Sequence, residues 1–405
     1  MCLTSKSLSL SEIGDVKEIK RKLNDFFYLE TSFLSGIPNE LYLKSQLRYF
    51  FNLLLNLYLN GNDISRFNKL YYLITFSRHK VVDELIYKIE KLRKIINPNY
   101  FAEPSIEEFL ISNYKFLKQF ENKDSNIKSI LHKVITEEYQ KKDKTYFKHL
   151  ISLVDFFKKS KNSFFTSVIL SNSTVTMDYV KGYSDLDIMI ILSKKVFESI
   201  KNIKKCRKEV IKASKQLYLH DPTQHHGFFI FTLSELLFYP EAVYPTVLHE
   251  FSSIITGKTN LSYSFTNDLL EKRVFLYRSI NKLISFIETD INQFDLFKAK
   301  DFISQVTLLP VLYIQYKGVY IYKRDAFQYL EKYFNNTSAF STAEQLRKEF
   351  PFKRVSFWPS FIHPTVLPVY YTKINNTYSL KKITQLKKEV LLLIIEITDK
   401  LLNEK

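Results

Sequence analysis

The sequence predicts an α+β protein in which a small mixed sheet with flanking helices lies between an all-helical N-terminal region and a helical C-terminal domain. Apolar residues recur at helical spacing through the first 158 residues and again after residue 263. Runs of β-branched and aromatic residues gather in the middle of the chain. The 405 residues are enough for two or three domains, and we place them at 1–158, 159–262 and 263–405.

The first region is expected to be helical throughout. Residues 41–59 are apolar on most faces, which predicts a buried helix ending at Asn60-Gly61. Residues 80–96 and 143–159 alternate apolar and charged positions at helical spacing, which predicts two amphipathic helices.

The middle region begins with a predicted strand at 163–170 and a second, strongly apolar strand at 188–192. A basic amphipathic helix follows at 194–216, and Asp221-Pro222-Thr223-Gln224 predicts a turn between strands at 216–220 and 227–232. We expect a short helix within 239–258. C-terminal helices are predicted at 269–288, 302–316, 324–333 and 379–403, with an ordered irregular loop at 350–371.

The segment Gly182-Tyr183-Ser184-Asp185-Leu186-Asp187 carries the clearest chemical signal. Alternate residues of a strand share a face, so Asp185 and Asp187 point the same way with Cα atoms about 6.6 Å apart. Two carboxylates this close raise each other's pKa unless a cation lies between them. The apolar run behind them places the pair at the mouth of a buried strand, which favours a divalent-metal site.

The text VILSNSTVTMDYVKGYSDLDIMIIL resembles the signature of the DNA polymerase β-type nucleotidyltransferase superfamily, and within it the minimal, antibiotic-modifying type. The resemblance implies that Asp185 and Asp187 are catalytic and bind Mg²⁺ or Mn²⁺. It also implies that the turn at Asn172 and Ser173, together with Ser184, contacts the phosphates of ATP or another NTP. Phosphoryl-type transfer needs cations to offset the charge of the triphosphate, and hard oxygen ligands suit Mg²⁺.

The sequence departs from this pattern in two places. Asn172 stands where glycine is usual, although asparagine tolerates positive φ better than most residues. The strand Gly227 to Thr232 lacks the third acid of the superfamily. His225 or His226 is our candidate for the missing group, as a general base or as a cation toward phosphate; a purely structural role in a hairpin is the alternative.

A basic loop between two C-terminal helices supplies Lys317, Lys323 and Arg324. In the minimal nucleotidyltransferases a helical domain after the catalytic unit helps to bind nucleotide, which makes Lys317 and Lys323 candidate triphosphate contacts. A solvated basic loop is the alternative.

The composition indicates which kinds of partner the protein can have. The net charge of +17 is compatible with a polyanionic partner such as RNA, and also with lysine enrichment from an AT-rich genome. No apolar run is long enough to cross a bilayer, and the two cysteines form no metal or disulfide motif, so we expect a cytoplasmic protein without a membrane partner.

The sequence therefore predicts a metal-dependent nucleotidyltransferase that moves an NMP, AMP from ATP first of all, to an acceptor hydroxyl or phosphate. A small molecule, an RNA and a protein all remain open as the acceptor. The alternative is a non-catalytic helical binding protein, possibly one that binds RNA, with a degenerate nucleotidyltransferase core.

Overall fold

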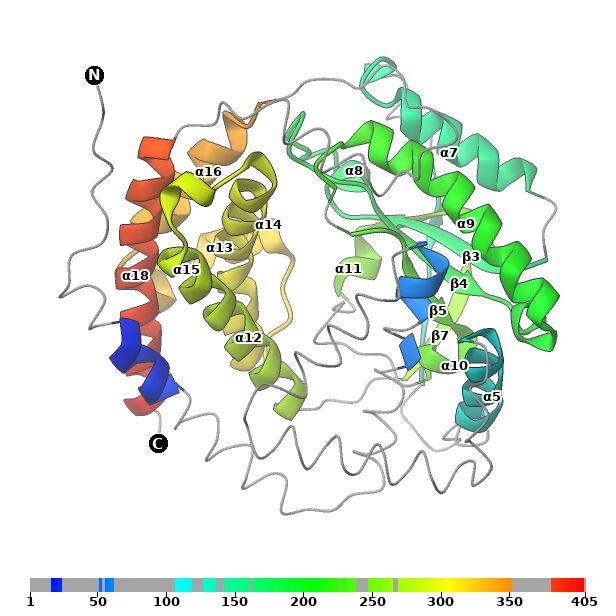
Figure 1. Ribbon diagram of the computed structural model, residues 1–405, viewed down its shortest axis with the longest axis horizontal. Helices are drawn as coiled ribbons and strands as arrows, with labels where there is room; N and C mark the ends of the chain where they lie inside the picture. Colours follow the sequence, from blue (N-terminus) through cyan, green and yellow to red (C-terminus); the bar gives the residue numbers. More distant parts are fainter. Residues whose placement is uncertain are drawn as a thin grey trace.

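A mixed sheet with flanking helices faces a helical bundle across the molecule (Figure 1). The computed structural model describes residues 16–23, 51–52, 55–61, 106–118, 127–135, 141, 143–160, 163–224, 226–237, 247–264, 269–351 and 380–403. The α+β class and the mixed sheet are as predicted. The predicted helix at 80–96, the loop at 352–371 and His225 lie outside the described residues.

The central sheet has five strands in the order β2 (Lys133–Val134), β6 (Ser252–Gly257), β3 (Phe165–Ser171), β4 (Asp187–Leu192) and β5 (Phe229–Thr232). Strand β3 is antiparallel to both of its neighbours, whereas β2 pairs with β6 and β4 pairs with β5 in parallel. A separate antiparallel pair joins β1 (Ile127–Leu131) to β7 (Asn260–Ser264).

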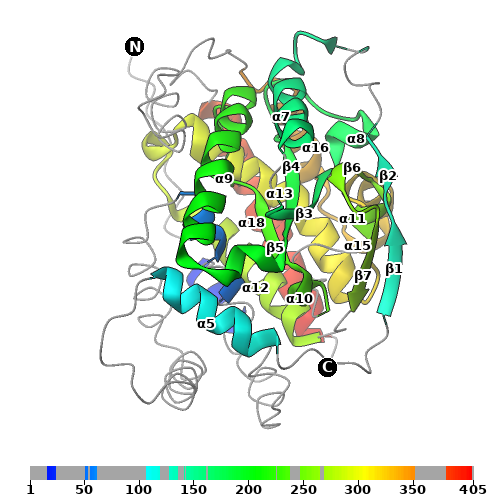
Figure 2. The ribbon, with the colours of Figure 1, turned by 90° about the vertical axis from the view of Figure 1, so that its right-hand side faces the viewer.

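Both faces of the central strands are covered. Helices α7 (Lys148–Lys159) and α9 (Ile200–His220) pack on the face that carries Ile188 and Ile190. Met189 and Ile191 face a smaller apolar cluster that includes Tyr263 of β7. This burial on two sides explains why β4 is apolar without alternation. Helix α5 (Ile106–Lys118) and the 3₁₀ turn η1 (Lys194–Glu198) extend the helical side (Figure 2).

The bundle consists of α12 (Leu269–Glu288), α13 (Leu296–Tyr316), α16 (Ser338–Lys348) and α18 (Leu380–Asn403). Short elements complete it: η2 (Ile291–Gln293), α14 (Lys323–Ala326), η3 (Phe327–Tyr329) and α15 (Leu330–Tyr333). The N-terminal residues 16–23 pack into this same core beside α18, far from them in sequence (Figure 1). The predicted C-terminal helices are confirmed, and α16 is an addition.

Two predictions of secondary structure are wrong. Residues 127–134 form strands and not helix, because their partners β7 and β6 lie more than a hundred residues away and leave no local signal. Residues 216–220 are the last turn of α9, since Leu217 continues its buried face. The short helix expected within 239–258 is present as α11 (Val247–Glu250), and strand β6 in the same stretch is an addition. The domain boundaries at 158/159 and 262/263 stay a prediction.

The outer edge of β5 is covered by a row of asparagines. Residues 51–52 and 55–59 are helical, and the helix ends as predicted at Asn60-Gly61, where Gly61 has a φ of 74°. Asn56 accepts from the N–H of Ile230 at 2.7 Å and donates to its carbonyl at 2.8 Å. Asn60 pairs in the same way with both backbone groups of Phe228, at 2.8 and 3.0 Å. The side chains thus replace a neighbouring strand and close the edge.

Candidate active site

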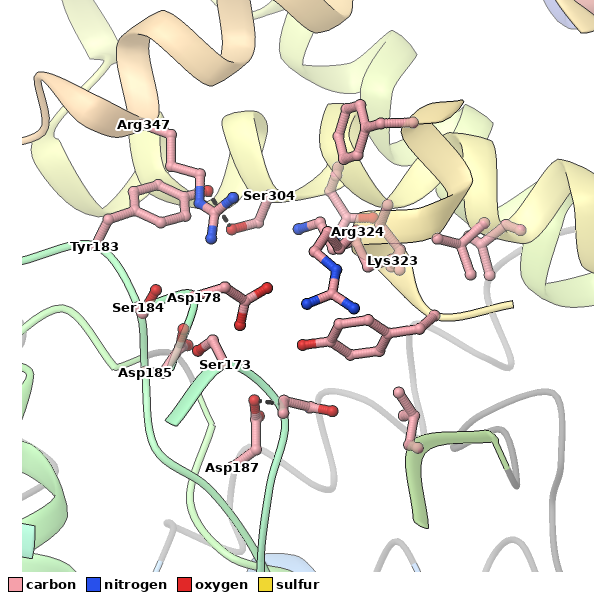
Figure 3. Close-up of a pocket in the computed structure, with 18 of the residues that line it drawn as sticks. Ser173, Asp178, Tyr183, Ser184, Asp185, Asp187, Ser304, Lys323, Arg324 and Arg347 are labelled. Atoms are coloured by element: carbon pink, nitrogen blue, oxygen red, sulfur yellow. Dashed lines mark hydrogen bonds between the residues drawn. The ribbon is translucent and has the colours of Figure 1, made fainter. Parts of the chain in front are cut away.

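An open cavity of about 870 Å³ lies between the β3–β4 end of the sheet and the bundle. Figure 3 shows acidic side chains entering it from the sheet side and cationic side chains from the bundle side. Asp185, Asp187 and Ser173 all line this one cavity. The cleft that the predicted site requires is therefore present.

The turn after β3 positions the first wall of the cavity. Ser171 pairs with Asp187 across β3 and β4, so the next residue, Asn172, lies beside the aspartate. Asn172 has φ 62° and ψ −143°, a conformation that glycine adopts most readily. Its Nδ2 donates to Oδ2 of Asp187 at 2.9 Å. The expectation that asparagine would allow a positive φ here is confirmed, and the side chain adds an orienting contact that glycine would lack.

Ser173 begins the four-residue helix α8 (Ser173–Thr176) and lines the cavity as predicted. Ser184 also lines it, but its hydroxyl oxygen accepts from the N–H of Val180 at 2.9 Å and so stabilises the turn before β4. The adjacent Tyr183 anchors this turn to the bundle, with its hydroxyl 2.7 Å from Oγ of Ser304 on α13. Both contacts fix the backbone that carries Asp185.

The two aspartates converge on His226. Its Nε2 lies 3.5 Å from Oδ2 of Asp185 and 3.3 Å from Oδ1 of Asp187, while Nδ1 is 2.9 Å from the carbonyl oxygen of Gly227. Burial lowers the pKa of His226, but the hydrogen bond to Asp187 and the charge of Asp185 outweigh it and raise the pKa to about 9. His226 thus pairs with the two aspartates and is not among the residues that line the cavity, so its position supports neither the base role nor a contact with phosphate.

A buried lysine lies behind the aspartates. Lys300 of α13 is 1% exposed, forms an ion pair with Asp221, and places Nζ 3.8 Å from Oδ2 of Asp185. Asp221 also accepts from the N–H and hydroxyl of Thr223, at 2.9 and 2.7 Å. Although burial acts to lower it, the pKa of Lys300 is raised by the carboxylates of Asp185 and Asp221. Lys300 thus connects the bundle electrostatically to the metal-site candidates.

Lys300 was not predicted from the sequence as a site residue, and its partner Asp221 was interpreted as part of a turn. A signal was present nonetheless. Lys300 follows Leu296 by four positions and precedes Ile303 by three, so it falls on the buried face of its helix. A lysine on such a face needs a carboxylate partner, because an unpaired buried charge is costly.

The bundle supplies the cationic wall. Lys323 and Arg324 of α14 and Arg347 of α16 line the cavity and point into it from the side opposite the aspartates (Figure 3). Burial and the neighbouring Arg347 lower the pKa of Lys323 to about 8. Arg347 is held by Glu344 at 3.0 Å and lies over the ring of Tyr183. The prediction for Lys323 is therefore supported by its position, whereas Arg347 lies on a helix that the sequence analysis missed.

Lys317 does not share this position. It is exposed, is not among the residues that line the cavity, and its Nζ lies over the rings of Tyr313 and Tyr316 at 5.4 and 5.5 Å. Lys258 is also remote, because its backbone bonds to Thr166 at the end of β3 opposite Asp187. The structure therefore does not bring Lys317 to the cavity, and its position does not support the predicted phosphate contact.

No acid lies on β5, as the sequence indicated, and Glu235 just after it closes a capping box with Thr232. The cavity nevertheless contains another carboxylate. Asp178 follows α8, accepts a hydrogen bond from Thr176, and lies between Ser184 and Arg324 in Figure 3. The sequence analysis passed over Asp178 because it belongs to the turn between the strands rather than to a strand.

Among the described residues, no three His, Cys, Asp or Glu side chains are arranged to hold a metal ion by themselves. Asp185 and Asp187 nevertheless fit a Mg²⁺ site, because an oxygen of each lies within 3.5 Å of one atom, Nε2 of His226, and Mg²⁺ bound between them would replace that imidazolium as their counterion. Mg²⁺ commonly uses one or two carboxylates and takes its remaining ligands from water and substrate phosphates.

Comparisons with protein-family models, with curated protein sequences and with solved structures found no significant match. No described helix is long and apolar enough to cross a membrane. Interpretation of the cavity therefore depends on its own geometry and charge.

Proposed function

We propose that this protein is a metal-dependent nucleotidyltransferase that transfers a nucleoside monophosphate, AMP from ATP in the simplest case, to an acceptor hydroxyl or phosphate. One observation carries the proposal. Paired aspartates from the sheet and cations from the bundle meet across a single open cavity. That arrangement suits a ligand with a metal at one end and several phosphates beside it.

The strand arrangement supports the superfamily assignment that the sequence suggested. The Ser173 turn follows β3, the antiparallel partner β4 begins with Asp187, and β5 runs parallel to β4. Mg²⁺ or Mn²⁺ held by Asp185 and Asp187 would offset charge on the triphosphate and on its pyrophosphate leaving group.

The residues of the chain then have separate roles. Lys323, Arg324 and Arg347 bind and orient the phosphates from the bundle side. Asn172 orients Asp187 through its 2.9 Å hydrogen bond. Lys300 places a positive charge 3.8 Å from Oδ2 of Asp185. Asp178 adds a further carboxylate to the sheet side of the cavity.

The test is transfer of label from each α-³²P NTP in the presence of Mg²⁺, with RNA, protein and small-molecule acceptors offered in parallel. We expect transfer that Asp185→Asn or Asp187→Asn abolishes. The exposed Asp155 on α7 gives the matched control, and Asp155→Asn should leave the rate unchanged. If the protein neither binds an NTP nor transfers label to any acceptor, the proposal fails.

The second candidate is a non-catalytic nucleotide-binding protein. The absence of an acid on β5 favours it, whereas Asn172 no longer does because it holds the conformation usual for glycine. Saturable, Mg²⁺-dependent NTP binding without transfer to any acceptor would select this second candidate.

A further inference from the structure

Helix α9 presents a straight row of lysines to solvent. The positions recur at steps of four and three residues, so on a helix of 3.6 residues per turn they fall within a sector of about 80° and extend over about 21 Å. The opposite face is buried and includes Ile203, Val210 and Leu217. We call the row the α9 lysine stripe, and its members are Lys201, Lys205, Lys208, Lys212 and Lys215, of which the first four are exposed and Lys215 is half-buried.

The stripe is not neutralised within the described part of the chain. Helix α9 contains seven Lys or Arg residues and one acid, Glu209. The two cations off the stripe have structural partners: Lys204 lies 3.8 Å from Glu107, and Arg207 donates to the carbonyl of Tyr58 at 2.9 Å. The stripe lysines form no ion pair with a described residue, although like charges three or four positions apart destabilise a helix. An external polyanion would remove this repulsion.

The stripe is directed toward the candidate active site. Helix α9 ends at His220, and the next residue, Asp221, forms an ion pair with Lys300, which lies 3.8 Å from Asp185. The C-terminal end of α9 therefore lies behind the aspartate side of the cavity, separated from it by buried residues. Figure 1 shows α9 extending from there along the sheet, with one end beside α8, and Figure 2 shows it on the outer side of the sheet.

We propose that the α9 lysine stripe binds the sugar–phosphate backbone of a nucleic-acid strand, RNA in the first instance, whose end reaches the active-site cavity. A linear row of exposed ammonium groups matches a linear polyanion. A membrane surface fits less well, because interfacial helices place large apolar side chains beside their lysines, and α9, all of which is described, exposes none. The role of the strand as acceptor depends on the proposed function, whereas its binding to the stripe does not.

The test is fluorescence anisotropy with a labelled single-stranded RNA, titrated at several salt concentrations. Each phosphate contact contributes about −0.7 to the slope of log K against log salt for a single strand. Lys205→Gln, Lys208→Gln and Lys212→Gln together should therefore make the slope less negative by about 2, and weaken binding about 100-fold near 0.1 M salt. The matched control exchanges the exposed bundle lysines Lys332, Lys381 and Lys388 for Gln and should change neither quantity.

Single-stranded DNA, duplex RNA and anionic phospholipid vesicles are the comparison ligands. Equal loss of RNA binding in the stripe and control variants would overturn the proposal, as would binding to vesicles but not to any nucleic acid. Asp185→Asn should bind RNA as the native protein does, which separates the two proposals. Label transfer to a small molecule with no RNA binding refutes the stripe alone, and RNA binding with no transfer to any acceptor refutes the enzyme alone.

Discussion

Replacing each asparagine that covers the edge of β5 by alanine should destabilise that strand, by an amount that depends on how many of its backbone groups lose their hydrogen-bond partner. Asn60→Ala leaves both the N–H and the carbonyl of Phe228 without their partner. Asn56→Ala leaves only the N–H of Ile230 unpaired, since Nδ2 of Asn52 also donates to the Ile230 carbonyl at 2.8 Å. For the same reason Asn52→Ala leaves no backbone group unpaired, because Asn56 still donates to that carbonyl.

The magnitudes follow from this count. A buried polar group that loses its only partner costs about 1–3 kcal/mol. We therefore expect a loss of about 2–6 kcal/mol for Asn60→Ala, about 1–3 kcal/mol for Asn56→Ala and less than about 1 kcal/mol for Asn52→Ala. Helix propensity predicts a different order, because alanine improves the helix interior and would stabilise the Asn52 and Asn56 variants.

Hydrogen–deuterium exchange read by mass spectrometry measures the effect where it occurs. Exchange of the peptide that contains β5 should accelerate about tenfold for each 1.4 kcal/mol of lost local stability, while the peptide that contains β3 stays protected. Asn281→Ala is the matched control, since the hydrogen bonds that its amide makes to described residues are to Tyr277 of its own helix, with the carbonyl at 3.1 Å. Unchanged β5 exchange in Asn60→Ala, or equal effects in all three variants, would refute the reasoning.

Three other substitutions test the site and its support. Burial and Arg347 lower the pKa of Lys323 to about 8, so the positive charge of Lys323 and the affinity of the protein for Mg²⁺–ATP should fall as the pH rises from 7 to 9. Calorimetric titration should show this loss of affinity in the native protein and an affinity that does not change with pH in Lys323→Arg. Asn172→Gly removes the strain of a positive φ on a side-chain-bearing residue but also removes the hydrogen bond to Asp187. The melting temperature should therefore stay the same or rise, while any nucleotidyl transfer becomes slower. A large drop in melting temperature would contradict this. His132 and His249 are buried with pKa values lowered by burial to about 4 and about 3. Both stay neutral in the folded protein and protonate in the unfolded chain below pH 6.5. The free energy of unfolding, measured by urea titration, should therefore be steady above that pH and fall below it by about 1.4 kcal/mol per pH unit for each histidine. The fall should be less steep in His132→Gln.

The part of the site that could be predicted from the sequence is the part marked by short-range patterns. Asp185 and Asp187 were found because a buried strand and its mouth are contiguous in sequence, and Asn172 because a turn between strands has its own backbone demands. Lys300 and Arg347 are brought to the cavity only by the packing of the bundle against the sheet, which no local pattern encodes. The position of Lys317 could not be predicted for the same reason, since it faces solvent six residues before Lys323, which lines the cavity.

The fold shows the same division. The long helices and the apolar strand β4 have a period of their own, so they were predicted from their own residues. Strands β1 and β2 are short, and β1 pairs only with β7, far along the chain. The hydrogen-bond partners at the edge of β5 could not be predicted either, because they are a row of helix side chains rather than a strand.

The charge layout of the cavity restricts its ligand more than either wall does alone. The aspartate wall repels a free polyanion, and the wall of Lys323, Arg324 and Arg347 repels a polycation such as an aminoglycoside. A ligand that satisfies both walls must present positive charge to the sheet side and negative charge to the bundle side. A metal–triphosphate complex has this layout, with the metal near the carboxylates and the phosphates near the cations. Under the two proposals, the cationic wall and the α9 lysine stripe favour a phosphate-bearing strand as acceptor over a cationic small molecule.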